Sequence, residues 1–563
     1  NMDKNIFLHI KKSFKIIDLL NLFDSEGKKN RYPDLSIYFE KNKFIGILTL
    51  GDLRRIRKKT SNLYKPAIKY LNKNPITIKN IKDGEKYSKI LKKCEEKKLS
   101  IERVKYIFKL DKDKNLVEII DGHEFYNNFY FKKISVIGQG YVGLCLSGHL
   151  AKTHSNVLGF DNDTNKIKNL RKQLIPIKEP NLNVALKTAS LNRNLRFVSK
   201  LESSEIYIVC FGTENNSSQT DNKNLFNFIN QLSKNIKKND LIILRGTLSI
   251  GITKKIADII EKKTKLQIGK EFYLSYSPER IVEGDAMNEL ENIPQIVSGV
   301  TENCLVKALN FWRNFVKETI KTKNTNEAEL IKLLNNAHRL YSFSFANMTS
   351  ILAEKYNLNT YDLIGKANYG YSRNPISKPS TGIGGFCLIK DFKILSQSSK
   401  LNIFDSEFKI LNEVNKTIIN TPLRSIKKFE KIQKKKLSKI LIFGFAFKGI
   451  PQTNDCRNSP GLILSNNLLS NGYQVFLYDN IAKSEDVSLS DKKGLKFINR
   501  INQDYINKMD AIIIMNNHEK NEEIISRNLK KQKKSKLFFD SYAQFDSKVL
   551  EEFNYDYSTL GNN

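Results

Sequence analysis

Cysteine is scarce in this 563-residue chain, which also lacks a long apolar run. The six cysteines are scattered and include no Cys-x-x-Cys pair, which argues against a disulfide framework or a zinc site. No stretch reaches the roughly 18 apolar residues of a membrane-spanning helix, and no signal-peptide pattern follows the N-terminus. We therefore expect a cytoplasmic protein with reduced thiols, no resident metal and no membrane insertion.

Acidic residues are also under-represented, since 59 of them face 94 basic ones and leave a formal net charge of +35. Such a surplus is typical of nucleic-acid-binding proteins. Here the lysines are spread along the whole chain, including positions 431–436 and 530–536, and no nucleic-acid-binding motif accompanies them. We therefore expect a basic solvated surface and no nucleic-acid partner, with the long-range field favouring a small anionic substrate.

Residues 1–130 contain a faint internal repeat. Residues 44–55 form an apolar stretch that runs into a charged helix start, and 116–125 repeat that shape 72 residues later, so that Ile119 corresponds to Ile47. The repeat resembles a tandem CBS pair, a module that often binds adenine nucleotides.

Two positions of the repeat bear on ligand binding. Thr49 and Asp52 match the ribose-contacting pattern of the CBS family, whereas Asp121 and Glu124 stand at these positions in the second copy. Two acids there would repel a phosphate. Binding of an adenine nucleotide and a purely packing or oligomerisation role both remain open.

Residues 132–161 carry a dinucleotide-binding pattern. An apolar strand precedes Gly138-x-Gly140-x-x-Gly143, a Leu-rich stretch follows, and a second strand ends at Asp161. The glycines permit a tight turn, close approach of a pyrophosphate and close packing of helix on strand. The acid accepts from ribose hydroxyls and repels a 2′-phosphate, so the pattern predicts NAD rather than NADP.

Further α/β alternation follows. Two buried-strand patterns end in Gly-Thr, at Thr213 and Thr247. Ligands of doubly wound sheets bind at the carboxyl ends of the strands, so these hydroxyls are expected near cofactor or substrate, with turn capping as the alternative. Residues 437–545 have the strand pattern of a second, smaller α/β unit, and the Lys-rich stretch 427–438 is predicted to be the linker into it.

A long helical pattern and a cysteine-containing turn complete the chemistry. Lys332 and Asn336 are four residues apart in the pattern 325–365 and share one helix face. Cys387 follows a glycine-rich turn, with Lys390 and Asp391 close behind. Glycines let a ligand approach the backbone, and cysteine supplies a nucleophile. A nicotinamide site and a nucleophilic cysteine together suit the oxidation of an alcohol, through an aldehyde, to an acid.

These motifs are together similar to the UDP-glucose/GDP-mannose dehydrogenase family over about residues 132–545. Besides the dinucleotide pattern and the cysteine turn, matching segments are 176–182, 277–284, 445–448 and 455–460. The resemblance implies an α/β fold with two Rossmann-like doubly wound domains joined by a long central helix, which dimerises, after the CBS-like α+β pair. The implied domains are 1–130 (CBS-like), 131–324 (NAD-binding), 325–436 (central, with the cysteine turn) and 437–563 (UDP-sugar-binding).

The resemblance also implies the reaction. The C6 hydroxyl of a UDP-hexose would be oxidised to the uronic acid with two NAD⁺ per turnover, for surface polysaccharide synthesis. Cys387 would capture the aldehyde as a thiohemiacetal, which becomes a thioester that water hydrolyses. UDP-glucose, UDP-N-acetylglucosamine and UDP-N-acetylmannosamine all remain open as substrates, and GDP-mannose is less favoured. The alternatives are a single-step hydroxyacid dehydrogenase and a catalytically decayed protein that senses adenine nucleotides.

The resemblance further implies a role for individual residues of this sequence. Lys332 would stabilise oxyanions, Asn336 would orient that site, Asp391 and Glu283 would hold or activate water, and Thr247 would be a further partner of water or hydroxyl. The implied catalytic residues are Cys387, Lys332, Asn336, Asp391, Glu283 and Thr247. The implied cofactor-binding residues are Gly138, Gln139, Gly140, Tyr141, Val142, Gly143, Asp161, Lys166, Thr213, Thr247, Lys390 and Arg457. The implied substrate-binding residues are Glu279, Glu283, Lys332, Asn336, Gly384, Lys448 and Arg373, the last donated across a dimer interface.

Three positions depart from the family pattern. Phe386 precedes the cysteine where relatives often carry His, Ser, Tyr or Pro, Ile389 stands where proline is frequent, and Asp540-Ser-Tyr replaces the usual ending of the last strand. These departures leave the reaction class intact and the identity of the sugar open.

Overall fold

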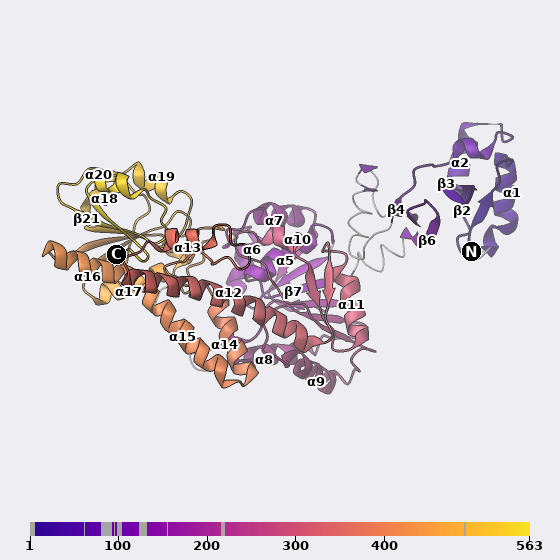
Figure 1. Cartoon of the computed structure of the whole chain (residues 1–563). Helices are drawn as coiled ribbons and strands as arrows, with labels where there is room; N and C mark the ends of the chain where they lie inside the picture. The colour runs from indigo at the N-terminus through magenta and orange to yellow at the C-terminus, as the bar shows by residue number, and fades with distance from the viewer. Residues whose placement is uncertain are drawn as a thin grey trace. The chain divides into compact units, whose positions relative to one another are not determined.

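The computed structural model describes residues 6–60, 62–79, 93–94, 96–97, 104–122, 132–154, 156–215, 220–488, 491 and 493–562. The chain divides into two compact units (Figure 1). One comprises 1–132 with 310–319, and the other comprises 133–309 with 320–563. The predicted boundary at residues 130 and 131 and the predicted acid Glu124 lie outside the described residues.

The first unit contains two three-stranded sheets with the same arrangement. Its elements are β1 (Leu8–Ile10), α1 (Ile16–Glu26), η1 (Gly27–Lys29), β2 (Leu35–Glu40), β3 (Lys43–Thr49), α2 (Leu50–Lys59), η2 (Ala67–Tyr70), β4 (Thr77–Lys79), β5 (Tyr106–Leu110) and β6 (Leu116–Asp121). In each sheet a parallel pair, β1 with β2 or β4 with β5, is followed by an antiparallel pair with β3 or β6. A register shift lies after Tyr38 in one sheet and after Lys109 in the other. The predicted repeat is therefore visible in the strand order.

One apolar core joins the two sheets of this unit. Leu35 and Phe44 from the first sheet lie in the same buried cluster as Phe108 and Ile119 from the second. The rings of Phe44 and Phe108 are 5.1 Å apart. Because burying a side chain of this size contributes roughly 1.5–3 kcal/mol, the sheets stabilise each other as one module.

The second unit begins with a six-stranded parallel sheet. Its strands are β7 (Ile134–Ile137), β8 (Val157–Phe160), β9 (Leu195–Val198), β10 (Ile206–Val209), β13 (Leu241–Leu244) and β14 (Tyr273–Tyr276). They are ordered β14-β13-β10-β7-β8-β9, which is the doubly wound order of dinucleotide-binding domains. Strands β7, β10 and β13 are buried throughout, because helices cover both faces of the sheet. Strands buried on both faces have near-continuous apolar sequences, as these three do.

The helices around this sheet are α5 (Tyr141–Ala151), α6 (Thr164–Arg171), α7 (Leu182–Leu191), α8 (Lys223–Leu232), α9 (Ile252–Thr264), α10 (Ala286–Asn292) and α11 (Glu302–Trp312). In Figure 1, α5, α7 and α10 lie on one side of the sheet, and α8 and α9 lie on the other. The short strands β11 (Glu214–Asn215), β12 (Thr220–Asp221), β15 (Gln295–Val297) and β16 (Thr319–Lys321) are additions to this domain.

A long helix, α12 (Thr325–Lys355), connects the two parallel-sheet domains over 31 residues. Asn324 caps its start by accepting from the Glu327 backbone N–H. Ala328, near the start, belongs to the core of the first sheet, whereas Ile351, near the end, packs against the core of the second. The helices α13 (Thr360–Asn368), α14 (Cys387–Ser399), α15 (Asn402–Ile419) and α16 (Thr421–Gln433) follow.

The prediction of a linker at 427–438 was wrong for most of that stretch, because α16 continues to Gln433. Ile426 and Phe429 are buried on one face of α16, and Lys427, Lys428 and their neighbours lie on the other. Lysine is a good helix former, so a Lys-rich stretch with apolar residues three apart becomes an amphipathic helix.

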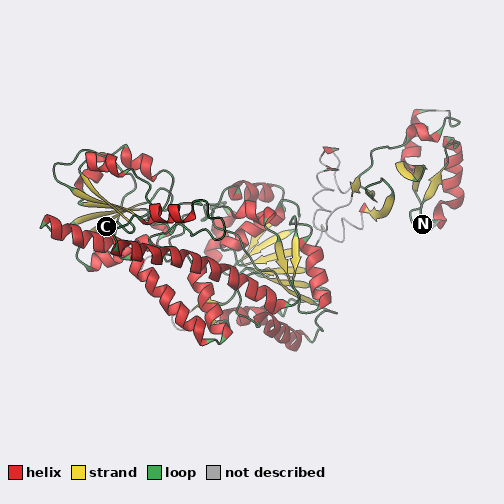
Figure 2. Cartoon of the chain, in the orientation of Figure 1, coloured by secondary structure: helices red, strands yellow, loops and turns green. Residues whose placement is uncertain are grey.

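A second six-stranded parallel sheet forms the C-terminal domain. Its elements are β17 (Lys439–Phe443), α17 (Pro460–Ser470), β18 (Gln474–Tyr478), η4 (Ser484–Asp486), β19 (Lys496–Phe497), α18 (Gln503–Lys508), β20 (Ala511–Ile514), α19 (Asn521–Ser526), β21 (Lys536–Asp540), α20 (Ser547–Glu552) and β22 (Tyr555–Thr559). The strand order, β19-β18-β17-β20-β21-β22, repeats that of the first sheet. Figure 2 shows both sheets as yellow arrows among helices, and the α/β class with parallel sheets is confirmed.

The two domains also share the turn after their first strand. Gly138 (φ +89°) donates its N–H to the Phe160 carbonyl at 2.8 Å, and Gly444 (φ +96°) donates to the Tyr478 carbonyl at 2.7 Å. The acid after the second strand of the C-terminal domain is Asp479. Asp479 accepts from the backbone N–H groups of 445, 446, 481 and 482 and from an asparagine side chain. Its carboxylate is thus committed to holding loops of its own domain.

Candidate active site

Cys387 is the first residue of α14 and is exposed to solvent, whereas the other five cysteines are buried or half-buried. The turn before it needs glycine. Gly382 and Gly385 have φ of +116° and +79°, a region in which side chains are strained. A Cβ on Gly384 would lie 2.6 Å from Cδ of Pro460. The glycines therefore allow the cysteine turn to lie directly against the C-terminal domain.

A buried carboxylate lies one turn further along α14. Asp391 is 1 % exposed, and its Oδ2 accepts from Asn336 Nδ2 at 2.6 Å and from Thr247 Oγ1 at 3.4 Å. Lys332 Nζ lies 4.0 Å from the same oxygen, and Lys390 Nζ lies 3.2 Å from Oδ1. Two cations and an amide thus compensate the buried charge. The predicted shared face of Lys332 and Asn336 is confirmed, because both reach Asp391.

Opposing charges act on the cysteine sulfur. Although part of Cys387 faces solvent, protein atoms on its other sides reduce its contact with water, and this desolvation, followed by repulsion from Asp391, raises the pKa of the Cys387 thiol. Lys332 and Lys390 lower the pKa, and Glu283 raises it. Burial and the two carboxylates outweigh the two lysines, so the net shift is upward.

A second group of charges surrounds Glu283, in the loop after β14. Its Oε1 accepts from Arg457 at 3.3 Å, its Oε2 accepts from Thr453 Oγ1 at 3.3 Å, and its backbone carbonyl accepts from Lys448 Nζ at 2.7 Å. Burial, with repulsion from Asp455, raises the pKa of Glu283 to about 7, against the opposite effects of Arg457 and Lys448. A carboxyl that titrates near neutrality can both give and take a proton, as general acid–base catalysis requires.

Lys448 and Arg457 both come from the C-terminal domain. Burial lowers the pKa of Lys448, whose ammonium lies beneath the Glu283 loop. The Arg457 guanidinium binds Asp455 through two nitrogens at 2.6–3.0 Å and also reaches Glu283. These contacts place residues more than 160 positions apart at the same site.

The dinucleotide pattern forms a loop with open space above it. A Cβ on Gly143 would lie 1.8 Å from the Gly138 carbonyl oxygen, so this glycine is required for helix α5 to pack against the turn. A Cβ on Gly140 would meet no described atom within 4 Å. Glycine at that position leaves room for the close approach of a pyrophosphate to the helix start.

Asp161 lies at the end of β8 beside this loop. It accepts from the N–H of Gln139 at 2.8 Å, from the N–H of Asp163 at 3.0 Å and from Lys166 Nζ at 2.9 Å. Burial alone would raise the pKa of Asp161, but the hydrogen bonds outweigh it and lower the pKa. An ionised carboxylate beside an open glycine turn fits NAD, since it can accept from ribose hydroxyls and repels a 2′-phosphate.

Tyr141 connects the dinucleotide turn to the Glu283 loop. Its hydroxyl donates to Glu179 and accepts from the Gly284 N–H at 2.9 Å. Glu179 also accepts from the N–H groups of Gly284 at 2.8 Å and Met287 at 3.2 Å. The predicted cofactor loop and the predicted substrate loop are therefore neighbours.

Three parts of one family match the chain. The NAD binding domain of the UDP-glucose/GDP-mannose dehydrogenase family matches residues 132–316, the central domain matches 326–417, and the UDP binding domain matches 441–547. The chain belongs to this family. Its members are NAD-dependent nucleotide-sugar dehydrogenases, and the chain is accordingly an oxidoreductase. The matched stretches leave the first 131 residues outside.

Several known proteins are similar to this dehydrogenase. The UDP-N-acetyl-D-mannosamine dehydrogenase of Methanocaldococcus jannaschii is 27% identical over 441 residues, which are 76% of this chain and 96% of that protein. The protein of the same name from Pyrococcus horikoshii is 28% identical over 415 residues, 72% and 94% of the two chains. A solved UDP-D-ManNAc dehydrogenase from P. horikoshii has a TM-score of 0.67 at 26% identity and covers 76% of this chain and 99% of its own.

Two residues of the dehydrogenase that were predicted to contact cofactor or substrate, Thr213 and Glu279, bind neighbouring loops in the structure. Thr213 Oγ1 donates to Asn222 Oδ1 at 2.7 Å and accepts from the Ser249 N–H at 2.9 Å. Glu279 pairs with the buried Arg245 and accepts from the N–H of residues 280 and 281. Contact of Thr213 and Glu279 with cofactor or substrate stays a prediction.

Three further residues that were predicted to bind cofactor or substrate are Gln139, Val142 and Arg373, and each has a different environment. The side chain of Gln139 turns inward, where Nε2 donates to the Val136 carbonyl at 2.8 Å. Val142 is half-buried in the first turn of α5. Arg373 lies in the exposed loop after α13, with its guanidinium 5.8 Å from the Tyr371 ring.

Sequence reasoning missed a buried carboxylate on α12. Glu329 is 0 % exposed and accepts from the N–H of Gly251 at 2.6 Å, from the N–H of Thr253 at 2.9 Å and from Thr253 Oγ1 at 2.6 Å. It anchors the start of α9, and with it the loop that carries Thr247, to the helix that carries Lys332. The available signal was spacing, because Glu329 lies one turn before Lys332 on the same face.

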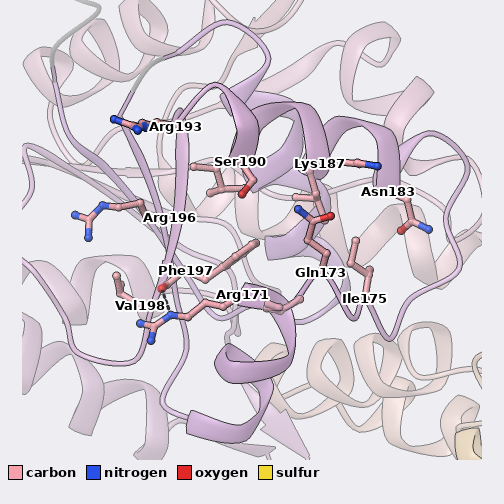
Figure 3. A pocket seen from close by; sticks show the side chains of 13 residues that line it. Arg171, Gln173, Ile175, Asn183, Lys187, Ser190, Arg193, Arg196, Phe197 and Val198 are labelled. Carbon is pink, nitrogen blue, oxygen red and sulfur yellow. Dashed lines mark hydrogen bonds between the residues drawn. The ribbon is translucent and has the colours of Figure 1, made fainter.

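A hollow of about 550 Å³ lies on α6, α7 and β9, and Figure 3 shows its lining. None of the predicted site residues lines it. Of the arginines that line it, Arg171 donates to the Phe197 carbonyl at 2.9 Å and Arg196 pairs with Glu202 at 3.1 Å. This hollow is therefore separate from the candidate active site.

Within the described ranges, no group of three or more His, Cys, Asp or Glu side chains is arranged to hold a metal ion. Among the described helices, none has the length and apolar character needed to cross a membrane.

Proposed function

We propose that this dehydrogenase oxidises the C6 hydroxyl of a UDP-hexose to the uronic acid, with UDP-N-acetyl-D-mannosamine as the foremost substrate, for surface polysaccharide synthesis. The observation that carries the proposal is the exposed Cys387 beside Lys332, Asn336 and Asp391, against the domain that matches the family's UDP binding domain. The names of the similar archaeal proteins favour the N-acetylmannosamine derivative over the UDP-glucose alternative.

The overall reaction converts one alcohol, two NAD⁺ and one water into one carboxylate, two NADH and three protons. When bound, NAD⁺ accepts a hydride from the sugar carbon in each of the two oxidations. The turn at Gly138–Gly143 with Asp161 would hold its pyrophosphate and ribose, and Lys166, Lys390 and Arg457 are further proposed contacts. Glu283, with its pKa raised to about 7, would take the hydroxyl proton directly or through a water in the first oxidation.

Cys387 then keeps the intermediate on the protein. Its thiolate forms a C–S bond to the aldehyde carbon, and the resulting oxyanion is stabilised by the Lys332 ammonium and the Asn336 amide. Loss of the second hydride from this thiohemiacetal leaves a thioester. Water then attacks the thioester carbon, the C–S bond breaks, and Cys387 leaves as thiolate while Glu283 and Asp391 orient the water and receive its proton.

The experiment is an NADH count with limiting sugar nucleotide. Purified protein would be supplied with UDP-N-acetylmannosamine, UDP-N-acetylglucosamine, UDP-glucose or GDP-mannose. We expect two NADH per sugar consumed, with UDP-N-acetylmannosamine the best substrate. One NADH per sugar would mean that the reaction stops at the aldehyde. Preference for GDP-mannose would contradict the UDP assignment, and no NADH with any sugar nucleotide would favour the decayed, nucleotide-sensing alternative.

We also propose that the first unit is a CBS-like pair that binds an adenine nucleotide. Its two sheets share one strand order and one bulge position. Thr49 and Asp52 form the capping box at the start of α2, with Thr49 Oγ1 donating to Asp52 Oδ2 at 2.7 Å. AMP or ATP should raise the melting temperature of the full chain and raise it less in Asp52→Ala. An unchanged melting temperature of the wild-type chain would favour a purely packing or oligomerisation role for this unit.

A homodimer is proposed through the central helix. Phe345, Met348 and Leu352 are 53 %, 38 % and 58 % exposed and recur at intervals of three or four on one face of α12, and Tyr356, 64 % exposed, follows at its C-cap. Two copies of such a stripe are self-complementary in a two-fold dimer. A second copy of this chain would also bring the exposed Arg373 to its neighbour, as the proposed contact across the interface requires.

A further inference from the structure

Phe386 stands immediately before Cys387 and is 43 % exposed, although it is a large apolar side chain beside charged residues. The centre of its ring lies 5.1 Å from Lys390 Nζ and 5.1 Å from Arg457 Cζ. Both distances are within the range in which a cation is attracted to the electron-rich face of an aromatic ring. The one ring therefore contacts two cations.

These two cations belong to the two charged groups of the active site. Lys390 lies on α14 and is 3.2 Å from Asp391, with a side chain that is 13 % exposed. Arg457 lies in the C-terminal domain and contacts Glu283 at 3.3 Å. Phe386 thus contacts both the lysine that pairs with Asp391 and the arginine that contacts Glu283.

The backbone fixes the position of the ring. The Gly385 N–H donates to the Arg457 carbonyl at 3.1 Å, and Asn458 Nδ2 donates to the Gly385 carbonyl at 3.2 Å. These bonds hold the residue before Phe386 on the loop that carries Arg457. The turn therefore fixes the backbone from which the ring projects toward Lys390 and Arg457.

Charge at these positions acts on the nucleophile. Burial raises the pKa of the Cys387 thiol, and Lys390 acts in the opposite direction. The pKa of Arg457 is raised first by its hydrogen bond to Asp455 and, to a smaller extent, by the charge of Cys387. A cation that turns away into solvent loses this effect, because water screens exposed charges strongly.

We propose that Phe386 is a positioning residue that holds the Lys390 ammonium and the Arg457 guanidinium against its ring and so keeps their positive charge next to the turn that carries Cys387. The inference rests on the proposed role of Cys387 as nucleophile. It assigns a purpose to an aromatic residue at a position where the family pattern varies.

The test is the pH dependence of Cys387 alkylation by iodoacetamide in the full chain without substrate, followed by mass spectrometry of the Cys387 peptide. Phe386→Leu should raise the apparent pKa of the thiol by about half a unit and slow alkylation about threefold at neutral pH. Phe386→Tyr and Phe386→Trp keep an aromatic face and should retain the wild-type profile. Circular dichroism would show that each variant is folded.

A matched control is available in the C-terminal domain. Lys496 Nζ lies 5.1 Å from the Phe476 ring, so Phe476→Leu removes a contact of the same length and should leave the alkylation profile unchanged. In turnover, the defect of Phe386→Leu should disappear at alkaline pH, where the thiolate is fully formed. A packing role would instead cause a defect at every pH.

Two results would overturn the inference. One is an unchanged alkylation profile in Phe386→Leu, and the other is an equal defect in the Leu, Tyr and Trp variants. Either result is distinguishable from failure of the proposed function, because the NADH count of the wild-type protein tests that function independently of Phe386.

Discussion

The side-chain amide of Asn336 donates to Asp391 Oδ2 at 2.6 Å, a contact that joins the central helix α12 to the helix that begins with Cys387. Asp391 is 1 % exposed, so its charge depends on protein donors in place of water. The contact therefore serves stability and site geometry together.

Asn336→Leu should lower the free energy of unfolding by roughly 1–3 kcal/mol, because a buried carboxylate loses a donor that water cannot replace. Urea denaturation would measure the change. Asn335 is the neighbouring residue on the same helix and is exposed, so Asn335→Leu should change stability by less than about 0.5 kcal/mol. Equal effects of the two substitutions would contradict the assigned role of the contact.

The sequence predicted those parts of the site that depend on local pattern. The strand, the glycine turn and Asp161 lie within 30 residues, and their spacing alone predicts the dinucleotide loop. Lys332 and Asn336 were placed on one face by helix periodicity, and the structure brings both to Asp391.

Contacts between distant segments could not be predicted in this way. Glu283 and Arg457 are 174 positions apart, and only the packing of the C-terminal domain onto the first sheet brings them together. Phe386 was recognised as a departure from the family pattern, but its two cationic neighbours depend on the same packing. At 427–438 the charge of the lysines concealed the apolar spacing of Ile426 and Phe429, and a helix was predicted as a linker.

Glu283→Gln should stabilise the protein at alkaline pH. The folded pKa of about 7 lies above the ordinary value of 4.5, so the contribution of Glu283 to stability is complete below about pH 4.5 and is lost as the pH rises through 7. Glutamine does not ionise and avoids this loss. Thermal unfolding at pH 8 should show a gain of roughly 1–3 kcal/mol that vanishes near pH 4.5.

The matched control for that substitution is Glu551→Gln, since Glu551 is exposed on α20. It should leave the pH dependence of unfolding unchanged. A Glu283→Gln protein that is less stable than the wild type at pH 8 would show that the pairs with Arg457 and Thr453 outweigh the burial of the charge.

Asp161→Asn should lower kcat/KM with NAD⁺ and reduce the preference of the enzyme for NAD⁺ over NADP⁺. The carboxylate would no longer repel a 2′-phosphate, and Lys166, now 2.9 Å from Asp161, would be available to attract one. Steady-state kinetics with both cofactors should show about a tenfold loss of kcat/KM for NAD⁺, equivalent to about 1.4 kcal/mol, with no loss for NADP⁺.

Asp163 offers a control two residues away. It caps α6 by accepting from the N–H groups of residues 165 and 166, and Asn is an equally good cap. Asp163→Asn should therefore leave both kinetic constants unchanged. An unaltered cofactor preference in Asp161→Asn would remove the argument for NAD that rests on this acid.

Leu352→Glu should dissociate the proposed dimer. Leu352 is 58 % exposed in the middle of the apolar stripe on α12, and a charge there would be buried without a partner in the interface. Sedimentation should show the monomer mass for this variant and the dimer mass for the wild type. Ile432 is 62 % exposed on α16, and Ile432→Glu should leave the dimer intact. A wild-type monomer would contradict the proposed interface.

Cys387 is proposed to carry the second oxidation, and a single-turnover NADH count in Cys387→Ala is the decisive experiment. Wild-type protein with excess NAD⁺ and limiting UDP-N-acetylmannosamine should form two NADH per sugar, and the variant should form at most one, with the aldehyde recoverable by a hydrazine trap. Two NADH per sugar from Cys387→Ala would show that the acid forms without a covalent intermediate on Cys387 and would contradict the account.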